Sequence, residues 1–304
     1  MWSMCHVLGA LSFFYTASGI NNGKLVDVRK FPYVVAILLE SSLDSYSCTG
    51  GIVSDKFVIS AAHCFSTSRP YNELFFKTKQ NYQERLVKVY PGVNNVRQIK
   101  TTDWYALAVE IYILKKYFVD IIADIALLKL DRSLGQSRIP FQKLKIPDQD
   151  KGVESDYKRG VYWTAGYGED PSKDKTNPQN AGCLKQIFTV PIARDKCKGT
   201  KAIPIKDTKQ LCCLSVENDA TLELPSVPLG TCRGDSGSPI VMRTKGTDQE
   251  TIIGLVGTGR ETYDSRKTPE IHINVAAFVD DFIKPVIEDR VISYPTIGKY
   301  RSKV

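Results

Sequence analysis

Residues Gly234 to Pro239 read GDSGSP, a glycine-rich segment with Ser236 between Asp235 and Gly237. It places Ser236 in a tight, glycine-rich turn, where the backbone can approach another molecule closely. Taken alone, this is also the composition of an ordinary turn. A serine hydroxyl is a weak nucleophile near neutral pH unless a neighbouring base accepts its proton. The segment therefore directs attention to the histidines.

The chain has three histidines, His6, His63 and His272, and only His63 has a suggestive context. His63 lies next to Cys64 at the end of the segment ISAAHC (Ile59 to Cys64), and Asp124 begins the segment DIALLKL, which extends to Leu130. A histidine beside a cysteine is usually structural, and an aspartate before a strand is usually a turn residue. Together with Ser236, however, the three supply a base, a carboxylate to orient it and a nucleophile.

Composition excludes several classes of protein. Of the 304 residues, 42% are hydrophobic and 10% aromatic, which permits a large buried core and excludes collagen-like, coiled-coil and polytopic membrane proteins. The net charge of +8 comes from 41 Lys and Arg against 33 Asp and Glu, interspersed along the chain. A dispersed excess of basic residues is more typical of an ordinary solvated surface than of a surface that binds nucleic acid. A polyanion-binding protein, retained on heparin in a salt-dependent manner, is the corresponding alternative.

The N-terminus predicts export. The first nineteen residues contain no Lys, Arg, Asp or Glu, and the apolar stretch from Val7 to Thr16 is followed by the small residues Ala17, Ser18 and Gly19. This pattern indicates a signal peptide over residues 1–19, the alternative being a buried N-terminal strand. Eight cysteines suit an oxidising compartment, and seven remain once Cys5 has left with the signal. Seven is odd, so at least one thiol stays free or pairs between molecules.

Short apolar runs bounded by turn residues predict an all-β chain with one late helix. The helix is expected over residues 275–287, with Pro285 weakening or ending it. The polar stretch from Asp148 to Lys158 is expected to link two halves of similar size. The expected strand regions are Tyr33 to Leu39, Gly51 to Ser60, Ile125 to Leu130, Ile187 to Ile192 and Ile252 to Val256.

The segments around His63, Asp124 and Ser236, in that order, resemble the chymotrypsin-like (trypsin-fold) serine proteases. The resemblance extends from Ile20 to the helix near Phe282 and implies a domain over residues 20–304. It implies an all-β fold of two packed six-stranded antiparallel β-barrels with a C-terminal helix. The first barrel is expected over about 31–140 and the second over about 159–275.

The resemblance also assigns roles to residues. His63 would accept the proton of Ser236, Asp124 would orient the imidazole, and the amides of Gly234 and Ser236 would form an oxyanion hole. A freed amine at Ile20, in a segment INNG that resembles the family's N-terminal Ile-Val-Gly-Gly, would pair with Asp235. Gly19 precedes Ile20 where the family's activators need Arg or Lys, so signal peptidase itself is expected to expose Ile20. The alternative is a short propeptide that another protease removes.

The cysteines follow the family only in part. The resemblance implies disulfides Cys48–Cys64 and Cys197–Cys212, although Cys213 could replace Cys212. The usual partner of Cys232 is missing, because no cysteine follows it, so Cys232 is expected to pair with Cys213 or Cys183 or to remain a thiol. Sixty residues separate His63 from Asp124, which predicts an enlarged loop. The close pair Cys212 and Cys213 has no histidine nearby, and no metal site is predicted.

The specificity pocket is expected to contain Gly230, Gly259 and Glu270. The resemblance implies that Gly230, six residues before Ser236, replaces the floor aspartate of trypsin-like members and that Glu270 enters from a side wall. This combination predicts cleavage after Lys or Arg together with cleavage after Phe, Tyr or Leu. In the alternative, Glu270 faces solvent and leaves an apolar pocket.

The resemblance therefore implies a secreted, monomeric serine endopeptidase that needs no cofactor. Its partners would be protein or peptide substrates and protein inhibitors, with no nucleic acid and no membrane. The alternative is a non-catalytic homologue that binds a partner through the same fold.

Overall fold

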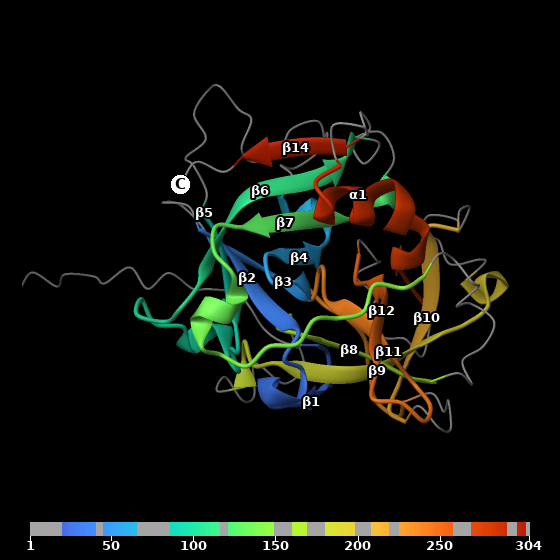
Figure 1. Ribbon diagram of the computed structural model, residues 1–304. Helices are drawn as coiled ribbons and strands as arrows, with labels where there is room; N and C mark the ends of the chain where they lie inside the picture. Colours follow the sequence, from blue (N-terminus) through green and yellow to red (C-terminus); the bar gives the residue numbers. More distant parts are fainter. Residues whose placement is uncertain are drawn as a thin grey trace, which may run out of the picture.

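A computed structural model describes residues 20–40, 45–65, 86–115, 121–148, 160–168, 180–197, 208–218, 225–257, 269–290 and 297–301, which form two antiparallel β-barrels (Figure 1). Each barrel closes through six strands, in the orders β2-β3-β4-β7-β6-β5 and β8-β9-β10-β13-β12-β11, so the expected fold class is confirmed. The strands of the first barrel are β2 (Val34–Glu40), β3 (Ser45–Ser54), β4 (Phe57–Ser60), β5 (Leu86–Pro91), β6 (Ala106–Leu114) and β7 (Ala126–Leu130). Those of the second are β8 (Gly160–Gly166), β9 (Lys185–Pro191), β10 (Gln210–Val216), β11 (Pro239–Thr244), β12 (Glu250–Leu255) and β13 (Glu270–Asn274).

The apolar runs form these strands because β-branched and aliphatic side chains fill the barrel interiors. In β2, six consecutive residues from Val34 to Leu39 are buried. The expected continuous run from Gly51 to Ser60 is wrong in one respect, because a turn at Asp55 and Lys56 divides it into the end of β3 and the whole of β4. In that turn the amide of Lys56 donates to Ser54 Oγ over 3.3 Å.

Two further strands extend the barrels beyond the six expected. The short strand β1 (Lys24–Leu25) pairs with β9 of the second barrel. The C-terminal strand β14 (Ile297–Arg301) pairs antiparallel with residues 110–114 of β6 and lies beside that strand in Figure 1. The first described strand, β1, therefore joins the second barrel, and the last described strand, β14, joins the first barrel.

The two barrels pack through a shared core. Trp163 Nε1 on β8 donates to Tyr33 Oη, just before β2, over 2.8 Å, and both side chains are buried. One cluster of buried hydrophobic side chains contains residues of both barrels and of the C-terminal helical segment. Burial of apolar surface between the barrels is the main force that fixes their relative position.

The C-terminal helical segment spans the expected residues but is not a single regular helix. Val275–Phe278 is 3₁₀, Val279–Ile283 is a π-helix, and α1 covers Lys284–Ile287. Pro285 lies in the four-residue helix α1, which continues directly from the π-helical segment and ends at Ile287, two residues after the proline. Further 3₁₀ segments within the described residues are Val28–Lys30, Ala62–Phe65, Val96–Gln98, Ile121–Ala123, Leu134–Ser137 and Arg194–Cys197.

Several expectations lie outside the described residues. These are the signal peptide over 1–19, most of the connection from Asp148 to Lys158, and residues 66–85 and 116–120 of the segment between His63 and Asp124 in which an enlarged loop is expected. In the part of the chain that the structure covers, we find no helix with the length and apolar character needed to cross a bilayer.

Candidate active site

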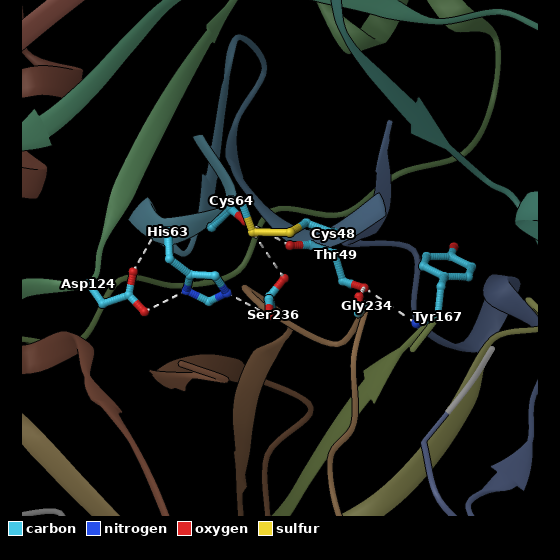
Figure 2. Close-up of a disulfide and its surroundings, with 9 residues drawn as sticks. Cys48, Thr49, His63, Cys64, Asp124, Tyr167, Gly234 and Ser236 are labelled. Atoms are coloured by element: carbon cyan, nitrogen blue, oxygen red, sulfur yellow. Dashed lines mark hydrogen bonds and ion pairs between the residues drawn. A yellow bond between two sulfur atoms is a disulfide. The ribbon is translucent and has the colours of Figure 1, made fainter. Parts of the chain in front are cut away.

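The structure brings His63, Asp124 and Ser236 into direct contact (Figure 2). His63 Nε2 lies 2.7 Å from Ser236 Oγ, and His63 Nδ1 lies 2.7 Å from Asp124 Oδ2. The second carboxylate oxygen, Oδ1, accepts the backbone amide of His63 over 2.8 Å. Asp124 therefore holds both the ring and the main chain of His63, which fixes the orientation of the imidazole.

The three residues come from different segments of the two barrels. His63 lies in the 3₁₀ segment that follows β4, and Asp124 lies two residues before the start of β7, which pairs with β4. Ser236 lies in the turn before β11 of the second barrel. Because β4 and β7 are hydrogen-bonded neighbours, the first barrel places His63 beside Asp124. The packing of the second barrel against the first then brings Ser236 to His63.

Asp124 changes the protonation of His63. The His63 side chain is 14% exposed and that of Asp124 is 2% exposed. Burial lowers the pKa of His63, but the negative charge and the hydrogen bond of Asp124 together outweigh burial, so the pKa lies above its ordinary value of 6.5. A stronger base beside Ser236 Oγ favours transfer of the hydroxyl proton to the imidazole.

The turn that carries Ser236 requires glycine at two positions. Gly234 has a φ of 90° and Gly237 a φ of 82°, a region that side chains disfavour. A Cβ at Gly237 would lie 2.0 Å from Ser60 Oγ and 2.4 Å from the carbonyl oxygen of Thr49, so the first barrel packs directly against this turn. Both glycines of the motif are thus needed for the turn and for its fit between the barrels.

Thr49, a buried residue of β3 that the sequence did not single out, ties the turn to the first barrel. Its hydroxyl donates to the carbonyl of Gly234 over 3.0 Å and accepts the amide of Tyr167 over 3.3 Å. Its own amide donates to the carbonyl of Ser236 over 3.0 Å. Figure 2 shows Thr49 between Gly234 and the Cys48–Cys64 disulfide. Only its position after Cys48 could have drawn attention to it.

Asp235, next to the nucleophile, is fully buried. Its Oδ1 accepts the amide of Gly168 over 2.8 Å, and its Oδ2 accepts the amide of Cys232 over 2.9 Å. Burial raises the pKa of Asp235 to about 7, even though these amides and the charge of Lys185 favour the carboxylate. Because the charge of Lys185 already acts on this carboxyl, only a further positive charge nearby would keep it fully ionised at neutral pH.

Ile20 lies close to the segment that precedes the nucleophile. Its side chain is buried and packs with Ile187 and Leu229. The amide of Asn21 donates to the carbonyl of Gly230 over 3.1 Å. The start of the segment INNG is therefore docked on residues 229–230, in the same part of the second barrel as Asp235.

Glu270, the expected wall residue, is buried, and its side chain is 5% exposed. Oε1 accepts the amide and the hydroxyl of Thr231 over 2.8 Å and 3.0 Å, Oε2 accepts Ser215 Oγ over 2.8 Å, and His272 Nε2 lies 3.6 Å away. Burial raises the pKa of Glu270, but His272, Ser215 and Thr231 outweigh it and hold the pKa below 4.5. The alternative in which Glu270 faces solvent is wrong.

The remaining pocket positions are less fully described. Gly230 is buried beside Thr231, and its carbonyl accepts the amide of Asn21. Gly259 lies outside the described residues, whereas Gly257 is described and a Cβ there would lie 3.6 Å from Asp124 Oδ2.

The structure contains the disulfides Cys48–Cys64 and Cys197–Cys212 that the resemblance implied. The first joins β3 to the segment that carries His63. Cys213 does not replace Cys212, because neighbouring residues of a strand face opposite sides, and Cys213 lies opposite Glu270 of β13. Cys183, Cys213 and Cys232 retain their thiols.

Two closed barrels with a histidine, an aspartate and a serine in contact at their junction define the class of chymotrypsin-like folds. The family model described as Trypsin matches residues 20–281, and the chain belongs to the trypsin family.

Several curated proteins are similar to this chain in sequence. The chain is 24% identical to a venom serine protease of the wasp Polistes dominula over 86% of this chain and 83% of that protein. It is 24% identical to ovochymase of the ascidian Halocynthia roretzi over 87% of this chain, and to bovine coagulation factor XI over 83%. The matched regions span only 15% of ovochymase and 35% of factor XI.

A similar solved structure is the scabies mite inactivated protease paralogue S-I1, with a TM-score of 0.62 and 20% identity. The match covers 88% of this chain and 99% of that one. At this identity the likeness establishes the fold alone.

Proposed function

We propose that the chain is a serine endopeptidase that hydrolyses peptide bonds through an acyl-enzyme formed on Ser236. The observation that carries this proposal is the continuous line of contacts from Ser236 Oγ to His63 Nε2 and from His63 Nδ1 to Asp124 Oδ2, each 2.7 Å long. Contacts of this length are those over which a general base accepts a proton from its nucleophile.

The chemistry follows from these contacts. Ser236 Oγ attacks the substrate carbonyl carbon while His63 accepts the hydroxyl proton, and Asp124 stabilises the resulting imidazolium. The amides of Gly234 and Ser236 stabilise the negative oxygen of the tetrahedral intermediate. His63 returns the proton to the departing amine, and water then releases the acyl group by the same two steps.

The residue before the cleaved bond would be either basic or large and apolar. Glu270 provides a buried, ionised carboxylate, which favours Lys or Arg in the pocket. Because that carboxylate already accepts hydrogen bonds from Ser215 and Thr231, it stabilises a substrate cation less than an unpaired acid would. Gly230 at the floor leaves room for Phe, Tyr or Leu.

The mature enzyme would begin at Ile20 after secretion and removal of residues 1–19. Its free amine would then pair with Asp235. Asn21 is already docked on Gly230, two residues before Cys232, whose amide donates to the buried carboxylate of Asp235. N-terminal sequencing of the secreted, active protein tests this step, and a sequence that begins upstream of Ile20 would contradict it.

Covalent labelling tests the proposed function. A fluorophosphonate should modify Ser236 of the mature protein, as detected by mass spectrometry of its peptide, while Ser236→Ala and His63→Ala should remain unlabelled. Ser137→Ala, which changes a half-buried serine at the end of the 3₁₀ segment Leu134–Ser137, is the matched control and should be labelled like the wild type.

A non-catalytic binding protein is the second candidate, since one similar fold belongs to a protein described as an inactivated protease paralogue. It predicts that the wild type does not react with the fluorophosphonate, so the same experiment separates the two functions.

A further inference from the structure

His272 is a buried histidine that the proposed mechanism does not use. Its side chain is 1% exposed, and neither ring nitrogen has a hydrogen-bond partner among the described residues. A buried imidazole usually makes such bonds, because an unpaired polar group costs free energy away from water. Nε2 lies 3.6 Å from Glu270 Oε2, close enough for an imidazolium and a buried carboxylate to attract each other. The strength of this contact therefore depends on whether His272 carries a proton.

The geometry of β13 brings the two side chains together. Glu270 and His272 are two residues apart, so they lie on the same face of the strand. On the neighbouring strand β10, Cys213 lies opposite Glu270 and Leu211 lies opposite His272, so the thiol of Cys213 is the titratable group on that side. The residues of β12 that pair with β13 have no titratable group. A base thus lies beside the carboxylate on the face from which the carboxylate projects.

The segment from Thr231 to Asp235 also contacts Glu270 and brings further titratable groups. It contains the buried thiol of Cys232 and the buried carboxyl of Asp235. Burial raises the pKa of Asp235, the charge of Lys185 lowers it, and the charge of Glu270 raises it, so the two carboxyls interact. A histidine is the side chain that ordinarily changes charge between about pH 5 and pH 8. The imidazole beside Glu270 is therefore the group on this face that is suited to respond in that range.

The electrostatics of Glu270 agree with this pairing. Burial raises the pKa of the Glu270 carboxyl, and among the groups that lower it, His272 has a larger effect than Ser215 or Thr231. A positive charge on His272 thus stabilises the carboxylate, and the carboxylate in turn stabilises the charge on His272.

We propose that His272 is a positioning residue that acts through Glu270, so that the preference for a basic residue before the cleaved bond rises as His272 loses its proton. This inference rests on the proposed peptidase function. When His272 is neutral, Glu270 offers a carboxylate without a neighbouring positive charge to a Lys or Arg side chain of the substrate. When His272 is protonated, its imidazolium neutralises that carboxylate and repels a second cation, so neutral apolar side chains are favoured.

Two peptides that differ only in the residue before the cleaved bond, Lys or Phe, test the proposal with the mature enzyme. The measurement is the ratio of kcat/KM for the Lys peptide to kcat/KM for the Phe peptide between about pH 5 and pH 8. Both peptides need neutral His63 and the same oxyanion hole, so titration of the catalytic groups cancels in the ratio. The ratio should rise with pH by at least about fivefold in the wild type, the lower end of typical coupling between two sites.

Two variants assign the effect to the pair. His272→Gln removes the titratable ring and keeps an amide that can donate to Glu270, so the carboxylate stays ionised. Its ratio should stay constant with pH, near the value that the wild type reaches at high pH. Glu270→Gln is the matched control, because it keeps the shape of the side chain and removes its charge. Its ratio should be low and constant.

NMR of the imidazoles tests the reverse effect of the substrate on His272. Residues 20–304 contain only two histidines, His63 and His272, so the mature Ser236→Ala variant gives two sets of signals. Coupling between two sites is reciprocal, so benzamidinium, a small aromatic cation, should lower the midpoint of the His272 titration by at least about 0.7 pH units. Neutral benzamide should leave it unchanged.

Other outcomes separate the failures. A ratio that varies with pH in His272→Gln as it does in the wild type would assign the effect to another group and overturn the inference. So would an unchanged His272 midpoint at a benzamidinium concentration that inhibits cleavage of the Lys peptide. A constant ratio in the wild type, with both peptides cleaved, would overturn the inference and leave the peptidase function in place. Cleavage of neither peptide at any pH would overturn the peptidase function itself and the inference with it.

Discussion

The hydroxyl of Thr49, on β3 of the first barrel, donates a 3.0 Å hydrogen bond to the carbonyl of Gly234, in the nucleophile turn of the second barrel. The same hydroxyl accepts the amide of Tyr167. One buried side chain thus satisfies two backbone groups that the packing of the barrels removes from water, and it connects the two barrels beside Ser236.

Replacing Thr49 by Val should therefore destabilise the protein, by about 1–3 kcal/mol, because a buried carbonyl and a buried amide lose their partner without a change in side-chain volume. Denaturant unfolding measures the loss. Thr49→Ser keeps the hydroxyl and should recover most of the hydrogen-bond contribution. Equal stabilities of Thr49→Val and the wild type would show that the hydrogen bonds of the Thr49 hydroxyl contribute nothing to the stability of the fold.

The pH dependence of activity should reflect the effect of Asp124 on His63. His63 acts as a base only when neutral, and its pKa lies above 6.5, so activity should fall with decreasing pH at a higher pH than for an ordinary histidine. Asp124→Asn should shift the midpoint of the His63 titration downwards, as measured by NMR of the imidazole, and should lower kcat about 10⁴-fold. An unchanged midpoint in Asp124→Asn would contradict the assignment.

Glycine at position 237 should be essential for the turn. Gly237→Ala adds a Cβ that would meet Ser60 Oγ and the Thr49 carbonyl at a φ of 82°, and we expect a loss of at least about 3 kcal/mol of stability. Gly246→Ala is the matched control: its φ is 79° but nothing lies within 4 Å, so only about 1 kcal/mol of backbone strain is expected. Thermal unfolding compares the two. Similar losses would mean that the contacts around Gly237 are unimportant.

Glu270 should control the preference for basic substrates. Glu270→Gln removes the charge and should reduce kcat/KM for Lys and Arg substrates by about 1–3 kcal/mol of transition-state stabilisation, with little change for Phe or Leu substrates. The ratio of the two rates is the measurement, because a general loss of folding would lower both equally. Unchanged rates on Lys substrates would remove Glu270 from the specificity pocket.

The sequence could predict the site residues because each belongs to a short local motif. His63 and Asp124 flank strands that are evident from their apolar runs, and the turn around Ser236 needs glycines that are visible in the sequence. The resemblance then supplied the barrels and their order, which no local pattern contains.

What the sequence could not predict depends on contacts between distant segments. Thr49 and Lys185 acquire their surroundings from the other barrel and from the opposite strand, and nothing in their neighbours indicates this. The choice between Cys212 and Cys213 depends on which face of β10 each occupies, and hence on its register with β13. Strand β14 forms because part of β6 offers an open edge, which is a property of the folded barrel.

Hydrolysis of a peptide substrate by alanine variants of Ser236 and His63 tests most directly whether the two residues act as one catalytic unit. We expect Ser236→Ala and His63→Ala each to lower kcat by about 10⁴-fold or more, with the unfolding transition retained and no further loss in the double variant. Near-native turnover by either single variant would contradict the account.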